Sequence, residues 1–583
     1  MESRQEMIGM AGKASGYLRS TALALVALAG LAGPAAAESL SGDYLAARQA
    51  SFFGDFKAAG DYYGRAIAFD PENPALLERA ALAHLSLGDI PHAVELAERL
   101  STQGYQSQIG HMAQIADLAK REDYATILSR IDEQTAIGPL VDGLARGWAE
   151  LGRGDMSAAL VAFEAMAQEQ GLQSFASYHK AMALASVGDF EGAETIFEAG
   201  DAGTLQFTRR AVQARSQILS QLDRQDDAVA MIDEGFPPPR DPSLEQMRSA
   251  LVAGEKLPFT YVNSPRDGIA EVFYTVAGAL SSEANDDFTL LYSRIAEYLR
   301  PDHSGAILMS ANLLESLGQY DLAVDTFKRV PRDDADYFSA ELGRAEALRS
   351  DGKPDAAVEV LEQLAQTNGN QISVQSALGD MMRQLERYDQ AVAAYDAAIS
   401  GFVEEHPAQW FLYYARGIAK ERLKDWQAAE ADFRKALELN PGQPQVLNYL
   451  GYSLVEHHAK LDEALSMIEQ AVATEPQSGY IVDSLGWALY RLGRYEDAVA
   501  HMERAAELMP VDPVVNDHLG DVYWAVGRTL EAEFQWKRAL SFVDWEEASD
   551  EVDPERIRQK LKVGLDQVLS EEGKPPLKVA NGE

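Results

Sequence analysis

The feature that most constrains this chain is a sequence pattern that returns about every 34 residues near its carboxyl-terminal end. Between residues 444 and 540 three copies follow one another, each with a Leu-Gly pair and, further on, an alanine. The Leu-Gly pairs are Leu450-Gly451, Leu485-Gly486 and Leu519-Gly520, with spacings of 35 and 34 residues, and the alanines are Ala464, Ala498 and Ala532. A fixed period of this length predicts helix hairpins that stack, because one hairpin alone leaves an apolar face exposed to water.

The small residues of the pattern indicate where two helices cross. We expect Gly486 and Ala498 at the crossing point of one hairpin, where a larger side chain would cost roughly 1–3 kcal/mol through overpacking. The space around them is filled by Leu485, Leu489, Tyr495 and Met502. Pro476 and Pro510 mark the ends of second helices, since proline cannot continue a helix.

The combination of Leu-Gly, Gly-x-Tyr, Ala and Pro at this period resembles the tetratricopeptide repeat. Weaker copies recur from residue 40 onward, to about thirteen in all. The resemblance implies an all-α fold, a right-handed solenoid of helix hairpins. The expected organisation is a signal peptide over 1–37, a partly degenerate solenoid over 38–235, a Pro-rich junction over 236–266, a second solenoid over 267–546, a capping helix over 553–569 and a flexible tail over 570–583.

The predicted junction interrupts the repeats. Residues 236–242 (FPPPRDP) cannot be helical, because proline restricts both itself and the residue before it. Helical periodicity returns only near Ile269. The sequence leaves open whether this stretch is a hinge or a rigid, packed corner.

The amino terminus has the pattern of an export signal. Basic residues precede an apolar run over 21–33, and Pro34-Ala35-Ala36-Ala37 follows. We expect cleavage after Ala37 and a periplasmic product of a Gram-negative bacterium. An uncleaved anchor would need about 20 apolar residues, more than this run has. No integral membrane segment is therefore expected after cleavage.

Composition and motifs argue against several classes of function. The net charge is −40, which disfavours nucleic acid, since that affinity comes from Lys and Arg displacing counterions. Cysteine is absent, so disulfides and thiolate metal sites are excluded. Catalytic and phosphate-binding motifs are missing, so we expect neither an enzyme nor a cofactor. Histidines look scattered, and adjacent His457 and His458 would point about 100° apart on a helix, so no metal site is expected.

The predicted binding surface is the concave face formed by the first helices of successive hairpins. Helical spacing places there Tyr414, Asn448, Tyr452, Tyr480, Asp483, Trp487, Tyr490, Asp517, Asp521 and Trp524. Exposed aromatic side chains at such positions serve as contact anchors. The alternative, that these rings pack between neighbouring repeats, stays open. An acidic and aromatic groove fits a basic or neutral extended segment best.

The last four repeats also carry a more specific resemblance. The runs from Tyr413 to Ala419 and from Asn448 to Ser453, and the segments around Asp483 and Asp517, resemble exported tetratricopeptide proteins of alphaproteobacteria. They are more distantly similar to a pseudomonad lipoprotein adaptor of a carboxyl-terminal processing protease. The resemblance covers roughly 265–540 and implies a non-enzymatic adaptor that brings a periplasmic protease to cell-wall hydrolases.

This chain lacks the lipidated cysteine of that adaptor, so membrane tethering does not carry over. The leading hypothesis is a periplasmic scaffold or adaptor that binds protein partners in its groove. The alternative hypothesis is a structural subunit of an envelope assembly or export machinery.

Overall fold

The computed structural model describes residues 40–133, 137–201, 203–237, 240–281, 283–368, 371–543, 552–574 and 577. Within these ranges all regular structure is helical, which confirms the predicted all-α fold. None of the described helices is both long and apolar enough to cross a membrane. The predicted signal peptide, cleavage site and most of the predicted tail lie outside the described residues.

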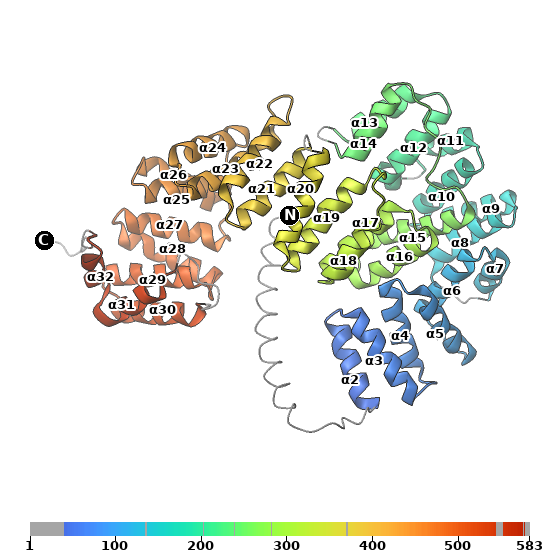
Figure 1. Ribbon diagram of the computed structural model, residues 1–583, viewed down its shortest axis with the longest axis horizontal. Helices are drawn as coiled ribbons and strands as arrows, with labels where there is room; N and C mark the ends of the chain where they lie inside the picture. The colour runs from blue at the N-terminus through green and yellow to red at the C-terminus, as the bar shows by residue number, and fades with distance from the viewer. Residues whose placement is uncertain are drawn as a thin grey trace. The chain divides into compact units, whose positions relative to one another are not determined.

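The chain forms two compact units, Met1–Ala347 and Leu348–Glu583 (Figure 1). The helices that begin in the first unit are α2 (Leu40–Phe52), α3 (Phe56–Phe69), α4 (Pro74–Leu87), α5 (Ile90–Thr102), α6 (Gln108–Lys120), α7 (Tyr124–Asp132), α8 (Pro139–Gly152), α9 (Met156–Ala167), α10 (Gln173–Ser186), α11 (Phe190–Ala199), the 3-10 helix η1 (Gly203–Phe207), α12 (Arg209–Gln221), α13 (Gln225–Gly235), α14 (Pro242–Val252), α15 (Pro265–Leu280), α16 (Asp286–Leu299), α17 (Ser304–Ser316), α18 (Tyr320–Phe327) and α19 (Tyr337–Ser350). The boundary between the units falls inside α19.

The second unit continues the series of hairpins. Its helices are α20 (Pro354–Asn368), α21 (Ile372–Gln384), α22 (Tyr388–Ser400), the 3-10 helix η2 (Pro407–Gln409), α23 (Trp410–Arg422), α24 (Trp426–Leu439), α25 (Pro444–Glu456), α26 (Leu461–Thr474), α27 (Gly479–Arg491), α28 (Tyr495–Leu508), α29 (Pro513–Ala525), α30 (Thr529–Phe542), α31 (Pro554–Val563) and α32 (Leu565–Glu571). Each helix packs mainly on its neighbours in sequence, as stacked hairpins require.

Short Gly-Asp turns join the two helices of many hairpins. Gly154 adopts a left-handed conformation with φ of 84°, which favours glycine and ends the first helix. The next residue, Asp155, accepts a hydrogen bond from the Ala158 backbone N–H at 2.9 Å and so caps the second helix. Asp55 caps α3 through Ala58 at the same distance.

The predicted crossing points are confirmed. A Cβ atom at Gly486 would lie 2.4 Å from Met502 Sδ, and one at Gly520 would lie 2.5 Å from the Trp536 ring. Ala498 is fully buried at the same level, and Leu485, Leu489, Tyr495 and Met502 are buried around it. The small residues therefore allow the two helices of a hairpin to approach closely.

The first unit turns back on itself. The hairpin of α15 and α16 packs against α4, α6, α8 and α10, which are the first helices of four successive hairpins (Figure 1). Gly268 of α15 contacts the indole of Trp148, and the Arg294 Nε of α16 donates to the Ser86 carbonyl at 3.1 Å. The inner face of these four helices is thus covered by the chain's own later helices.

The described residues of the predicted junction, 236–237 and 240–266, lie inside the first unit. They include α14, so the prediction that helix returns only near Ile269 is wrong: Pro242 stands in the first turn of α14, where proline is tolerated. The stretch after α14 is tied to α12 by hydrogen bonds. The Thr260 backbone N–H donates to Gln217 Oε1 at 2.8 Å, and the Leu257 N–H donates to Ser220 Oγ at 2.8 Å. Of the two alternatives left open by the sequence, these bonds correspond to the packed corner.

The predicted capping helix over 553–569 is two helices, α31 and α32, with Gly564 between them. A Cβ at Gly564 would lie 2.7 Å from the Trp524 ring, so glycine allows the chain to pass over the indole. Lys560 of α31 is completely buried and its Nζ lies 2.8 Å from Asp517 and 2.6 Å from Asp521.

Candidate functional site

The ten residues predicted for the concave face lie on the first helices of successive hairpins of the second unit, as expected. Tyr414 is on α23, Asn448 and Tyr452 on α25, Tyr480, Asp483, Trp487 and Tyr490 on α27, and Asp517, Asp521 and Trp524 on α29. Their role in partner binding stays a prediction.

The chain itself engages the three carboxylates predicted for the concave face. Asp483 lies 3.0 Å from His518 Nδ1, and Asp517 and Asp521 share Lys560. Trp536 Nε1 also donates to Asp521 at 2.9 Å. These carboxylates therefore hold successive helices together rather than standing free in a groove.

The two tryptophans also pack within the chain. Trp487 stacks on His518 at 3.8 Å and on Tyr490 at 4.8 Å between ring centroids. Trp524 lies under Gly564, and its Nε1 donates to Asp566 of α32 at 2.9 Å. Tyr480 is the most exposed of the predicted aromatic residues, with 38% of its surface accessible.

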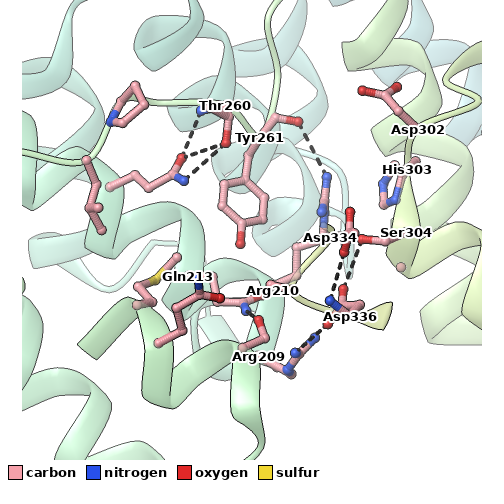
Figure 2. Close-up of a pocket in the computed structure, with 18 of the residues that line it drawn as sticks. Arg209, Arg210, Gln213, Thr260, Tyr261, Asp302, His303, Ser304, Asp334 and Asp336 are labelled. Atoms are coloured by element: carbon pink, nitrogen blue, oxygen red, sulfur yellow. Dashed lines mark hydrogen bonds and ion pairs between the residues drawn. The ribbon is translucent and has the colours of Figure 1, made fainter. Parts of the chain in front are cut away.

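Sequence reasoning missed a polar pocket of about 680 Å³ in the first unit (Figure 2). It lies at α12, the first helix of the hairpin that follows those covered by α15 and α16. Its other walls come from α14, the stretch after α14, the turn before α17 and the loop before α19. The lining includes Arg209, Arg210, Gln213, Gln217, Ser243, Gln246, Tyr261, Tyr274, Arg300, Asp302, His303, Asp333, Asp334 and Asp336.

Arg210 forms one wall of the pocket. Its guanidinium lies 4.7 Å from the centroid of the Tyr261 ring and 5.2 Å from that of Tyr274. The same group pairs with the buried Glu271 at 2.6 Å. Burial would raise the pKa of Glu271, but Arg210 and His303 hold that pKa well below its usual range. This wall is fixed by a neutralised ion pair and two aromatic rings.

Two buried histidines lie near this wall, and one of them, His303, itself lines the pocket. His179 accepts a hydrogen bond from Trp148 Nε1 at 3.1 Å, and burial lowers its pKa to about 4. His303 accepts the Ala306 backbone N–H at 3.1 Å, and burial together with Arg210 lowers its pKa to about 4. Both rings are therefore neutral near pH 7 and act as hydrogen-bonding parts of the core.

The other two arginines of the pocket are also engaged. Arg209 Nη2 lies 2.8 Å from both Asp241 and Asp336. Arg300 donates to the backbone carbonyls of Thr260, at 3.0 Å, and Tyr261. All three cations of the lining are thus committed to groups of the chain itself.

The loop before α19 supplies further carboxylates to the pocket. Asp333 and Asp334 form no ion pair with any residue in the described ranges, and Asp333 is exposed. Burial raises the pKa of Asp334, and its neighbours Asp336 and Asp333 raise it further, against a hydrogen bond from the Asp336 N–H. A cation entering the pocket would relieve this unfavourable electrostatic situation.

A cluster of His84, Asp89 and His92 lies outside the pocket, on the turn between α4 and α5. The sequence analysis treated the histidines as scattered and missed this cluster. The available signal was the spacing His-x4-Asp-x2-His across a Gly-Asp turn. The pocket offered no comparable signal, because its walls come from segments spread between residues 209 and 336.

A stack of helix hairpins with a pocket on an inner face defines a helical-repeat protein. Tetratricopeptide repeat models match residues 308–371, 370–442 and 482–510, so the chain carries tetratricopeptide repeats in these ranges. Such repeats serve as scaffolds for protein–protein interaction.

Curated relatives share parts of the chain. A TPR repeat-containing protein of Pseudomonas aeruginosa is 32% identical over 114 residues, which are 20% of this chain and 19% of the relative. The small glutamine-rich tetratricopeptide repeat-containing protein 2 of Mycosarcoma maydis is 34% identical over 87 residues, which are 15% of this chain and 24% of the relative. The chain thus spans less than a quarter of the length of either relative.

Solved structures give a looser likeness. Yeast Tom70 aligns with 91% of this chain and 98% of its own, at 15% identity and a TM-score of 0.35. A chain of the APC/C hetero-tetramer Cut9-Hcn1 aligns with 91% of this chain and 97% of its own length, at 14% identity and a TM-score of 0.37.

Proposed function

We propose that this protein is a non-catalytic periplasmic scaffold that binds other proteins, and that its pocket receives a basic side chain from a partner segment. The observation that carries this proposal is the charge state of the pocket. Its three arginines are paired within the chain, while Asp333 and Asp334 have no ion-pair partner among the described residues. Lysine or arginine of a partner is the natural complement to these carboxylates.

The rest of the lining suits a peptide. The exposed amide of Gln246 can donate to and accept from a peptide backbone, whereas Gln213 and Gln217 are bonded to Ser243 and Thr260 of the chain itself. The rings of Tyr261 and Tyr274 offer apolar surface to the stem of a long side chain.

The double variant Asp333→Asn and Asp334→Asn tests this function. Affinity capture from periplasmic extract should lose its specific partners, and a captured partner, once purified, should bind the variant at least tenfold more weakly. The matched control changes the same charge outside the pocket, with Asp61→Asn and Glu72→Gln, two exposed residues of the first hairpin and the turn after it. Equal binding by the double variant and the control would refute the role of the pocket.

We further propose that the partners include a periplasmic protease and cell-wall hydrolases. The support for this is the resemblance of the last four repeats to exported adaptors, together with the export signal. Osmotic-shock fractionation and amino-terminal sequencing test the location, with a mature start at Glu38 as the expected result. Recovery of the full-length precursor in the cytoplasm would contradict it.

The concave face of the second unit is a separate contact surface in this proposal. Tyr480 is the residue to test, because it is the most exposed of the aromatic residues predicted for this face. Tyr480→Ala should weaken partner capture without changing the helix content measured by circular dichroism. Unchanged capture would restrict partner binding to the pocket.

A further inference from the structure

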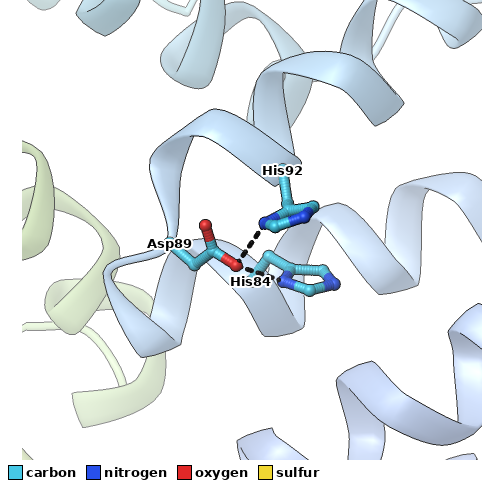
Figure 3. Close-up of side chains that lie close together, drawn as sticks. All are labelled: His84, Asp89 and His92. Carbon is cyan, nitrogen blue, oxygen red and sulfur yellow. Dashed lines mark hydrogen bonds and ion pairs between the residues drawn. The ribbon is translucent and has the colours of Figure 1, made fainter.

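We infer that His84, Asp89 and His92 form a binding site for a divalent transition-metal cation such as Zn²⁺. The three side chains meet at the turn between α4 and α5 (Figure 3). His84 Nδ1 lies 3.0 Å and His92 Nδ1 lies 2.7 Å from the same carboxylate oxygen, Asp89 Oδ2. Two imidazoles and a carboxylate are donors that Zn²⁺ and related metals prefer.

The distances suit a small metal ion. Tetrahedral zinc with bonds of about 2.0–2.1 Å holds its ligand atoms about 3.3 Å apart. One potential donor atom from each side chain lies within 4.8 Å of the others, and the two rings stack at 5.2 Å with both Nδ1 atoms turned toward Asp89 (Figure 3). Movements of a few tenths of an ångström would open the cluster enough to admit the ion.

The other Gly-Asp turns of the chain show that Asp89 is unusual. Asp55, Asp155 and Asp189 each accept a backbone N–H of the following helix and cap it. Asp89 occupies the same position before α5, yet its side chain makes no capping hydrogen bond and turns to the two histidines. The repeat has therefore given up a common structural interaction for this cluster.

The surroundings leave room for binding. The accessible fractions of the side chains are 23% for His84, 35% for Asp89 and 62% for His92, so water can complete the coordination. Arg294 lies beside Gly88 of the same turn, but its charge is paired with Glu297 at 3.3 Å. His84 lies on α4, Asp89 on the turn and His92 on α5, so the ion would stiffen the α4–α5 connection.

Metal-free full-length protein titrated with Zn²⁺ alone tests the inference. Isothermal titration should show one Zn²⁺ site. His92→Ala and His84→Ala should each weaken its Zn²⁺ affinity at least tenfold. Because His92 is mostly exposed, its loss of binding cannot be ascribed to unfolding, and circular dichroism verifies this. Co²⁺ should give the visible absorption of a tetrahedral nitrogen and oxygen site in the wild type and lose it in His92→Ala.

Matched controls separate this site from adventitious binding. His457→Ala removes an exposed histidine elsewhere, and Asp155→Asn changes the equivalent turn residue of another repeat; both should bind Zn²⁺ like the wild type. Asp89→Asn should bind more weakly than Asp155→Asn. Zn²⁺ binding that survives unchanged in a His84→Ala and His92→Ala double variant would overturn the assignment. It would also be overturned if only His457→Ala lost Zn²⁺ binding. This outcome is independent of protein-partner binding.

Discussion

At the scale of single residues, glycine decides how closely the helices of this protein approach. Gly147, Gly417 and Gly520 each face an aromatic ring of the second helix in their own hairpin. Gly268 plays a different part, because its neighbour Trp148 lies more than a hundred residues earlier in the chain. Because Gly268 has no side chain, α15 can pack closely against α8.

Gly268→Ala should destabilise the first unit. The new Cβ would lie 2.1 Å from the fully buried Trp148 ring, which also donates to His179, so either the ring or α15 must move. We expect a loss of at least about 1–3 kcal/mol in the free energy of unfolding, measured by urea denaturation with tryptophan fluorescence.

Gly278→Ala is the control on the same helix. A Cβ there meets nothing within 4 Å, so the better helix propensity of alanine should leave stability unchanged or raise it by up to about 1 kcal/mol. Equal effects of the two substitutions would mean that the packing of α15 on α8 does not limit stability.

At the scale of helices, the carboxyl-terminal pair α31 and α32 completes the last repeat. Lys560 of α31 forms ion pairs with both Asp517 and Asp521 of α29, and Asp566 of α32 accepts from Trp524. In the preceding repeat, Asp483 of α27 contacts His518 of α29, the first helix of the next hairpin. At the end of the stack, α31 and α32 make the corresponding contacts with α29. The stack therefore ends with its acidic residues paired.

Lys560→Ala should loosen this end of the second unit. It leaves two carboxylates near one another in a buried setting, and breaking a buried ion pair in this way costs about 3–5 kcal/mol. Hydrogen exchange should show faster exchange in α29, α31 and α32. Lys562→Ala, an exposed lysine on the same helix, should change neither exchange nor stability; similar exchange in the two variants would disprove the structural role of Lys560.

Much of this helical organisation was predictable from the sequence. Leu-Gly pairs and alanines at a period of 34 residues located the crossing points, and proline located helix ends. The sequence could not reveal that α15 and α16 return to cover α4, α6, α8 and α10, because contacts such as Gly268 with Trp148 and Arg294 with Ser86 join residues far apart in the chain. The same limit applies to Trp487 and Trp524, whose helical position was right but whose neighbours, His518 and Gly564, come from later helices.

At the scale of the whole molecule, the two units contain buried histidines whose pKa values are shifted in opposite directions. In the first unit, burial lowers the pKa of His179 and of His303 to about 4. In the second unit, burial would lower the pKa of His518, but the carboxylates of Asp483 and Asp517 outweigh it and raise that pKa above its ordinary value. The contributions of these three histidines to folding stability should therefore respond to pH with opposite signs in the two units.

The sign follows from which state binds the proton. Below about pH 6.5 the unfolded chain protonates its histidines, while folded His179 and His303 stay neutral until about pH 4. Acid therefore favours the unfolded first unit over this window. For His518 the folded state binds the proton more tightly, so its contribution is fully present below about pH 6.5 and is lost as pH rises through the raised folded pKa.

Calorimetry of the full chain at pH 7.5 and pH 5.5 checks this prediction. The first-unit transition, identified as the one that Gly268→Ala shifts, should lose on the order of 2–3 kcal/mol at pH 5.5 from the two histidines together. His179→Gln combined with His303→Asn keeps acceptors for Trp148 and Ala306 and should remove most of this loss. If the double variant retains the full acid sensitivity, groups other than these histidines set the acid stability of the first unit.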